Sequence, residues 1–132
     1  MWQRFSIVAI LQVAACAHPV THPRLRAPNP NGCYAIVFEE PSFGGAGDVL
    51  NGPARLNGLD QVPETNQGNW RRRIRSLRVG RAAAVTAYVD TAFKRKSQHF
   101  APGTEHPQLD PAISARIQSL ELTCVDRPSV RR

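Results

Sequence analysis

The chain contains an internal repeat, and this repeat constrains its fold more than any other feature of the sequence. Residues 73–79 read Arg-Ile-Arg-Ser-Leu-Arg-Val, and residues 116–122 read Arg-Ile-Gln-Ser-Leu-Glu-Leu. Each of these segments follows, after a variable loop, one member of a second similar pair, at 38–45 and 88–95. Two all-β units of roughly forty residues cannot each bury an apolar face alone, so we expect them to pack together as one domain.

Short β-branched and aromatic runs, separated by glycine- and proline-rich segments, predict an all-β domain. The expected strands lie at 33–38, 74–79, 84–89, 93–100 and 117–122. We interpret 51–69 as a long connection and 101–112 as a loop, because both are rich in turn-forming residues. Helical periodicity is weak throughout, apart from a single turn allowed at 111–117. This pattern is typical of a β-sandwich or a β-barrel.

The spacing of aromatic, glycine and serine residues in the repeat resembles the Greek-key motif of the βγ-crystallins. The residues that carry the resemblance are Phe38, Gly45, Ser76, Tyr88 and Ser119. It covers about 34–122 and therefore most of the chain. The resemblance implies an all-β, βγ-crystallin-like Greek-key β-sandwich, formed by a single domain of two motifs.

In the βγ-crystallins, the glycine folds the first hairpin over the sheet, and the serine hydroxyl hydrogen-bonds that folded hairpin. Both roles make physical sense, because only Gly enters positive φ at little cost and a buried hydroxyl needs a partner. The second copy departs from the family at Arg95, where the family has Gly. We therefore expect either a strained backbone at Arg95 or a second hairpin that bends differently.

Many microbial βγ-crystallin domains bind calcium through a short segment with Asn or Asp at its first two positions and Ser or Thr before a final Ser. Here the segments that end in Ser76 and Ser119 read Arg-Arg-Arg-Ile-Arg-Ser and Ser-Ala-Arg-Ile-Gln-Ser. Ca²⁺ requires oxygen ligands, and guanidinium groups stand at several of these positions. Glu40 or Asp90 alone would bind the ion weakly beside so many cations. We therefore expect no calcium site of this kind and no other cofactor.

The N-terminal segment has the features of an export signal. Arg4 supplies a positive charge, residues 5–15 are mostly apolar, and small residues precede Cys16. The apolar run is shorter than the roughly 20 residues that span a bilayer. Its end, Val-Ala-Ala-Cys, resembles the lipobox of bacterial lipoproteins, in which the Cys thiol is acylated and the preceding residues are removed. An ordinary secretory signal, cut after Ala15 or Ala17, is the alternative.

The lipobox resemblance implies a signal peptide at 1–15 and lipidation of Cys16. In many bacterial lipoproteins, an Asp directly after the lipidated Cys retains the protein in the inner membrane. Ala17 stands at this position instead, so the resemblance implies an outer-membrane lipoprotein, which we expect to face the periplasm. Residues 16–32 then form the lipidated Cys and a Pro-rich tether, which can reach roughly 50 Å. The other expected boundaries are 33–124 for the domain and 125–132 for a basic C-terminal tail.

Two further cysteines, Cys33 and Cys124, bracket the expected domain. An exported protein folds in an oxidising compartment, so we predict a disulfide between them that ties the first strand to the last. In the chain-entropy model, closing a loop of roughly 100 residues stabilises a fold by up to about 4–5 kcal/mol. Two free thiols are the alternative.

The formal charge of +7 is unevenly distributed, with clusters of cations at 71–81 and 94–96. Basic clusters bind anionic partners. In an exported protein we expect the partner to be an anionic envelope component or an envelope protein, and not nucleic acid. A solvated strand face is the alternative. The candidate binding residues are Arg71, Arg72, Arg73, Arg75 and Arg78.

The sequence offers little support for catalysis, because it lacks a sharp nucleophile turn, a phosphate-binding loop, zinc-ligand spacing and a redox pair. We therefore expect a protein that is not an enzyme. The first functional hypothesis is a membrane-anchored structural or binding module in the bacterial envelope. The alternative is a periplasmic inhibitor or immunity protein that blocks a proteinase or toxin, for which the 51–69 connection is long enough to dock.

Overall fold

The computed structural model of the chain describes residues 26–60, 62, 65 and 67–126. The predicted signal peptide, Cys16 and the first part of the predicted tether lie outside the described residues, as do residues 127–132 of the predicted tail. Within the described ranges, the helical segments are two 3-10 turns of three residues each. No helix there is long and apolar enough to cross a membrane.

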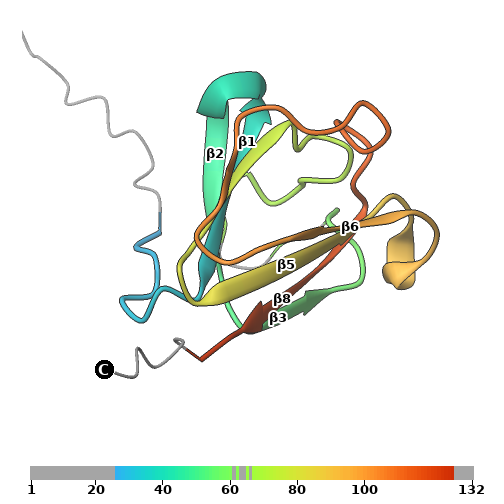
Figure 1. The fold of residues 1–132 in the computed structure, drawn as a ribbon. Coiled ribbons are helices and arrows are strands. Elements are labelled where there is room, and N and C mark those ends of the chain that lie inside the picture. The colour runs from blue at the N-terminus through green and yellow to red at the C-terminus, as the bar shows by residue number, and fades with distance from the viewer. Residues whose placement is uncertain (1–25, 61, 63–64, 66, 127–132) are drawn as a thin grey trace, which may run out of the picture.

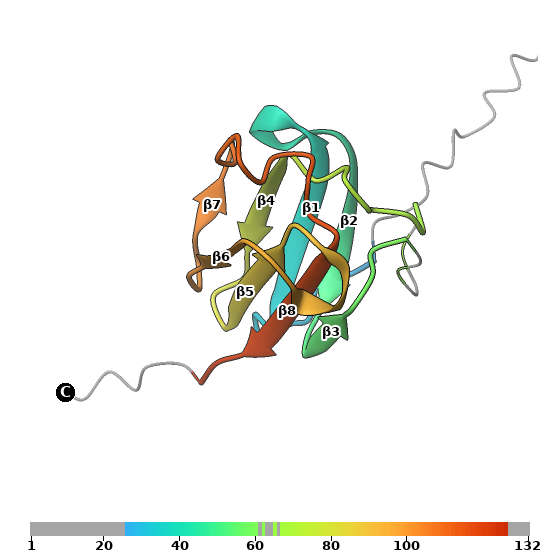
Figure 2. The ribbon, with the colours of Figure 1, turned by 90° about the vertical axis from the view of Figure 1, so that its right-hand side faces the viewer.

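The described residues form two antiparallel four-stranded sheets that pack on a common core (Figure 1, Figure 2). The order of the first sheet is β2 (Gly44–Asn51), β1 (Tyr34–Glu40), β4 (Ser76–Val79) and β7 (Glu105–His106). The order of the second sheet is β3 (Ala54–Leu56), β8 (Ser119–Cys124), β5 (Ala83–Tyr88) and β6 (Ser97–Phe100). The predicted all-β Greek-key sandwich of two motifs is confirmed.

Each motif contributes three strands to its own sheet and one strand to the other sheet. β3 belongs to the first motif but pairs with β8, and β7 belongs to the second motif but pairs with β4. The interpretation of 51–69 as a connection and of 101–112 as a loop was therefore incomplete, because each contains one exchanged strand. These strands are three and two residues long, too short to show an alternating pattern of their own.

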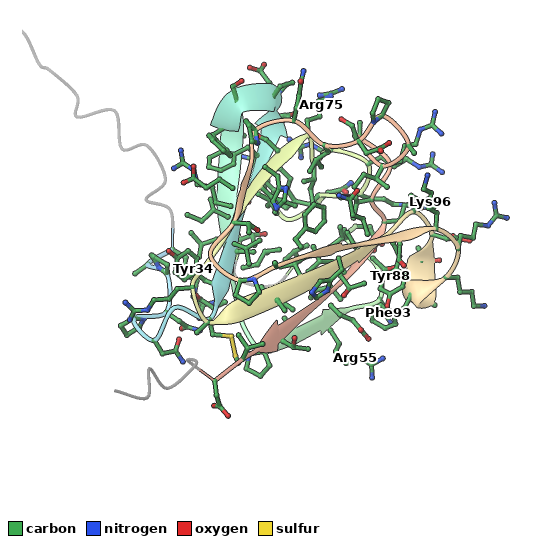
Figure 3. All side chains as sticks on the ribbon, in the orientation of Figure 1. Tyr34, Arg55, Arg75, Tyr88, Phe93 and Lys96 are labelled. Atoms are coloured by element: carbon green, nitrogen blue, oxygen red, sulfur yellow. A yellow bond between two sulfur atoms is a disulfide. The ribbon has the colours of Figure 1, made fainter. Side chains whose placement is uncertain are left out.

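The two exchanged strands carry ion pairs of opposite polarity. Arg55 on β3 faces Glu121 on β8 at 2.9 Å, whereas Glu105 on β7 faces Arg78 on β4 at 3.5 Å. The Arg55 guanidinium also lies 4.8 Å from the ring centre of Phe93 (Figure 3). Cross-strand pairs of opposite charge help to fix the register of such short strands.

In the first hairpin of each motif, a 3-10 turn connects the two strands. This turn is η1 (Pro41–Phe43) between β1 and β2, and η2 (Thr91–Phe93) between β5 and β6. Both turns contain residues in the left-handed region, with φ between 55° and 61°. The expected strand at 93–100 is therefore shorter than predicted, because η2 and the residues after it precede β6, which begins at Ser97. Each turn folds an aromatic ring back over its own hairpin, and the ring centres of Tyr88 and Phe93 lie 5.6 Å apart.

Gly45 and Arg95 occupy equivalent places after these turns and share one backbone conformation, with φ of 70° and 65°. The second hairpin thus bends as the first does, and Arg95 adopts a left-handed conformation that costs a non-glycine residue about 1–2 kcal/mol. Of the two expectations for Arg95, strain is the correct one. Arg95 Nε also lies 3.1 Å from Asp90 Oδ2, within the same hairpin.

Both motifs line the same core. Trp70 and Leu77 come from the first motif, Ile117 and Leu120 come from the second, and all four are fully buried. Trp70 Nε1 donates a hydrogen bond of 2.6 Å to the carboxylate of Asp48, which is itself 1% exposed. Because buried polar groups are costly without partners, this bond lets the core hold both an indole and a carboxylate.

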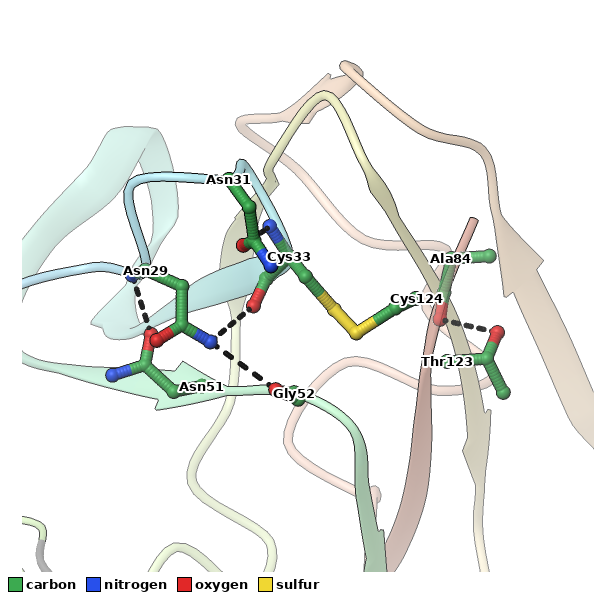
Figure 4. Close-up of a disulfide and its surroundings, with 8 residues drawn as sticks. All are labelled: Asn29, Asn31, Cys33, Asn51, Gly52, Ala84, Thr123 and Cys124. Carbon is green, nitrogen blue, oxygen red and sulfur yellow. Dashed lines mark hydrogen bonds between the residues drawn. A yellow bond between two sulfur atoms is a disulfide. The ribbon is translucent and has the colours of Figure 1, made fainter. Parts of the chain in front are cut away.

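The predicted disulfide between Cys33 and Cys124 is present, with the two Cα atoms 5.3 Å apart (Figure 4). Cys33 directly precedes β1 and Cys124 ends β8, so the bridge joins the two sheets.

The end of the segment predicted as a tether is bound to the domain beside this disulfide. Asn29 Nδ2 donates 3.1 Å hydrogen bonds to the carbonyl oxygens of Cys33 and Gly52 (Figure 4). The Asn29 backbone N–H donates to Asn51 Oδ1 at 2.7 Å. Asn29 is thus held against the domain, which shortens the part of the chain available as a spacer.

We expect the double variant Cys33→Ser/Cys124→Ser to lose about 2–5 kcal/mol in free energy of unfolding, because the bridge restricts the unfolded chain. Urea unfolding of the oxidised wild type and the variant measures this difference. Dithiothreitol should destabilise the wild type and leave the double variant unchanged. A variant as stable as the wild type would contradict the expectation.

Candidate functional site

Two buried serines hold the hairpins over the sheets. Ser76 Oγ accepts a hydrogen bond from Phe43 N at 3.0 Å and donates one to Glu40 O at 2.6 Å. Ser119 Oγ makes the same two bonds in the second motif, with the backbone of Phe93 at 3.1 Å and of Asp90 at 2.5 Å. Each hydroxyl uses its donor and an acceptor lone pair on one turn, so the surface loops beside the turns are held in fixed positions.

Four of the five candidate arginines already bind other groups of the fold. Arg71 Nε donates to Gln118 Oε1 at 2.6 Å, and Arg73 pairs with Glu39 at 2.9 Å. Arg75 donates to the backbone oxygen of Glu39 at 3.0 Å. The Arg78 guanidinium lies 4.0 Å from the ring centre of Phe43 and faces Glu105. The structure therefore distributes these side chains over several local contacts instead of presenting one continuous basic stripe.

Arg72 differs from these four. Its φ is 59°, and its backbone N–H donates to Ile117 O of the second motif at 2.9 Å. Its side chain is exposed and makes no hydrogen bond or ion pair with any described residue. Arg72 thus belongs by sequence to the first motif but lies against the second.

A surface pocket of about 720 Å³ lies where Arg72 meets the second motif. Its basic lining residues are Arg72, Arg95, Lys96 and Arg116. Asp90 and Gln118 also line it, and Gln118 is held by Arg71 and by its own 2.9 Å bond to Val89 O. Lys96 lies at the end of the second sheet, well away from Arg75 (Figure 3).

Sequence reasoning selected only one residue of this cationic group. Arg95 and Lys96 belong to the basic cluster at 94–96, and Arg116 lies in the segment that ends in Ser119, so no single stretch of the sequence joins them into one site. They are brought together only when Arg72 crosses to the second motif. A residue that favours the left-handed conformation, such as Gly or Asn, at position 72 would have indicated the crossing. Arg72 and its arginine neighbours give no such indication.

Three consecutive polar residues of the 101–112 segment, Thr104, Glu105 and His106, are engaged in structural contacts. His106 packs its ring edge-on against Phe100, with ring centres 4.7 Å apart, and hydrogen-bonds Thr104 Oγ1 at 2.8 Å. Burial lowers the pKa of His106, which favours the neutral ring in this position. Glu105 faces Arg78. These contacts hold all three side chains against neighbouring residues of the domain.

Comparison with known proteins gives a match only at the level of the fold. No protein-family model matches the chain, and a search of the curated proteins finds no match. Solved structures match with high probability. A βγ-crystallin domain from Clostridium beijerinckii has a TM-score of 0.58 at 19% identity, covering 68% of this chain and 97% of that one.

Two further structures agree. One, from work on the evolution of the eye-lens βγ-crystallin domain fold, has a TM-score of 0.63 at 14% identity over 76% of this chain and 95% of that one. The N-terminal domain of protein S has a TM-score of 0.59 at 20% identity, over 70% and 97% of the two chains. The chain has the βγ-crystallin fold. At these identities the likeness concerns architecture and not ligands.

In this βγ-crystallin fold, nitrogen donors stand where the calcium-binding segment of the family has a hydroxyl. Arg75 Nη1 donates to Glu39 O at 3.0 Å, and Gln118 Nε2 donates to Val89 O at 2.9 Å in the second motif. Each nitrogen occupies a backbone carbonyl oxygen through a hydrogen bond, and neither nitrogen is itself a ligand for Ca²⁺. Among the described residues there is also no group of three or more His, Cys, Asp and Glu side chains that could hold a metal ion.

We expect calcium to leave the melting temperature of the wild type unchanged. At about 1 mM calcium, a site with a Kd near 10 μM would stabilise the fold by about 2.7 kcal/mol, which differential scanning calorimetry with and without EDTA would detect. The variant Arg71→Asn/Arg72→Asp/Arg75→Thr restores the family segment and should gain a calcium-dependent rise in Tm. A rise in the wild type would show that guanidinium groups do not prevent binding.

Proposed function

We propose that this chain is a membrane-anchored βγ-crystallin-like lipoprotein of the bacterial outer membrane, facing the periplasm and acting as a binding module for an anionic envelope component. It needs neither calcium nor another cofactor, and it is not an enzyme. Its domain is compact, is closed by a disulfide and displays cations without partners.

Export and anchoring are supported by two features that lie at opposite ends of the tether. The lipobox-like segment precedes Cys16, and the disulfide of the domain is typical of an oxidising compartment such as the periplasm. The docked Asn29 limits the spacer to roughly 12 residues, which reach about 37 Å when extended. That length places the domain near the membrane surface without pressing it against the lipid.

The observation that carries the binding role is a set of exposed cations without partners. Among the described residues, the side chains in this state include Arg72, Lys94, Lys96 and Arg116. A cation without a carboxylate partner keeps its full attraction for an external anion, whereas a paired one such as Arg73 does not. This favours an anionic partner over a purely structural role.

The described residues contain no feature that favours the inhibitor alternative. The 51–69 segment, which would have to project as a docking loop, contains β3 and the buried side chains of Leu59 and Val62. A segment fixed in this way at several points belongs to the core of the domain. The binding-module hypothesis is therefore the one we develop.

Lipidation is tested by expressing the full chain and its Cys16→Ser variant in a Gram-negative host supplied with a palmitate analogue. We expect the wild type to incorporate the label and to fractionate with the outer membrane, and the variant to do neither. Label-free wild-type protein in the soluble periplasmic fraction would overturn the anchor.

A Cys16→Ser variant that starts at residue 16 also isolates the binding role. It carries neither the lipid nor the apolar segment 5–15, so any affinity it has for a membrane must come from the remaining protein surface. We expect it to float with vesicles of phosphatidylcholine and phosphatidylglycerol at low salt and to dissociate near physiological ionic strength or above, where the Debye length falls to about 8 Å. Equal flotation with pure phosphatidylcholine would contradict an anionic partner.

A further inference from the structure

The two motifs are related by pseudo-twofold contacts, so each side-chain position in one has a counterpart in the other. Arg72 N donates to Ile117 O and Ala115 N donates to Ile74 O, both at 2.9 Å. Arg72 and Ala115 also share a left-handed conformation, with φ of 59° and 57°. The chain therefore contains two sites of the same backbone geometry, and their side chains can be compared directly.

The second-motif site carries a strong positive charge. Its pocket is lined by the cations Arg72, Arg95, Lys96 and Arg116 and by one acid, Asp90. Three of these cations, all except Arg95, make no hydrogen bond or ion pair through their side chains within the described part of the chain. Like charges gathered around a concave surface repel one another and raise the local positive potential.

The first-motif site has the same backbone conformation and hydrogen bonds but carries no net charge. The residues at the equivalent positions are, in the same order, Ala115, Gly45, Ala46, Arg73 and Glu40. At two further equivalent positions, Glu39 corresponds to Val89 and Arg75 corresponds to Gln118, which gives the first-motif site one more acid and one more base. Arg73 is bound to Glu39, and Arg75 to the backbone. The fold alone therefore does not require the cations of the second site.

The size of the pocket limits what it can hold. A volume of about 720 Å³ falls within the range of small-molecule sites and leaves room for an anion with more than one phosphate group. Arginine side chains present paired N–H donors that match the oxygens of phosphate better than a point charge does. A carboxylate, with one negative charge, would leave most of the positive charge unbalanced.

We propose that this pocket binds a phosphate-bearing anion with at least two negative charges, of the phosphate monoester or pyrophosphate class, through Arg72, Arg116 and Lys96. This deepens the proposed function by naming the ligand chemistry and the site. Arg95 closes one side while its ion pair with Asp90 holds it in place. Gln118 forms part of the wall, but its amide is occupied by Arg71 and Val89 and does not bind the ligand.

The proposal is tested by titrating the mature full chain, in a neutral detergent, with inorganic pyrophosphate and following the backbone amides by NMR. We expect saturable shifts at Arg72, Arg95, Lys96 and Arg116, and much smaller shifts at Gly45 and Ala46, the counterparts of Arg95 and Lys96 in the first-motif site. Shifts of similar size at both sites, or shifts that do not saturate, would overturn a built site.

The matched variants are Arg72→Gln/Arg116→Gln in the pocket and Arg55→Gln/Arg81→Gln outside it, which remove the same charge. We expect the pocket pair to raise the Kd for pyrophosphate at least tenfold and the control pair to change it less than twofold. Equal effects would show diffuse attraction and overturn the proposal. Melting curves of both variants establish that each is folded. Arg116→Lys keeps the charge but loses the paired N–H donors, so it should bind pyrophosphate more weakly than the wild type and more tightly than Arg116→Gln.

Phosphate of this class can come from a lipid headgroup or from a free molecule. To distinguish the two, phosphatidic acid is added to the detergent micelles during the pyrophosphate titration. Competition between phosphatidic acid and pyrophosphate would identify the ligand as a lipid headgroup, and pyrophosphate binding without competition would identify it as a free molecule. Pocket binding by a chain that is not lipidated would leave this inference standing and overturn only the anchor. Lipid labelling at Cys16 without pyrophosphate binding would support the anchor and overturn this inference.

Discussion

The structure depends on the reciprocal exchange of backbone contacts between its two motifs. β3 completes the sheet of the second motif and β7 completes that of the first. Arg72 and Ala115 repeat the exchange at the ends of the sheets, each donating its N–H to the other motif. Neither motif can satisfy its own sheet edge, so burial of the core and completion of the sheets occur together. Cys33 and Cys124 then link the sheets covalently at the opposite end.

Once the backbone is held in this way, the side chains of the two motifs are free to differ. The exchanged strands show this in their ion pairs, where Arg55 and Glu121 in one sheet correspond to Glu105 and Arg78 in the other, with the charges reversed. The hairpins show it at Gly45 and Arg95, which share one conformation despite their different chemistry. The basic pocket follows the same principle: the second site has accumulated cations that its counterpart lacks.

The parts of the fold that could be predicted are those specified by local sequence. Ser76 and Ser119, with their repeated flanking residues, identified the motif and two of its strands, and the positions of Cys33 and Cys124 identified the disulfide. β3 and β7 could not be predicted, because their pairing is set by the partner strand and not by a pattern within three or two residues. The start of β6 was misplaced because η2 relies on a tertiary bond to Ser119.

The candidate site was less predictable than the fold for a related reason. The arginines of 71–78 are close in sequence. They nevertheless contact different partners, because some lie in the turn before β4 and Arg78 lies on β4 itself. Arg72 and Arg116 are far apart in sequence, yet the crossing of one motif over the other lines the same pocket with both. Charge density along a sequence therefore located the basic region but not the surface where cations remain unpaired.

Native-state hydrogen exchange tests most directly whether the two motifs depend on each other. If the exchanged contacts hold both together, the amides of Arg72 and Ala115 and those at the centres of β1 and β8 should exchange with one common free energy, equal to that of global unfolding. The same denaturant dependence should be seen for all of them. Rapid exchange throughout one motif, while the other stays protected, would mean that each folds alone and would contradict this account.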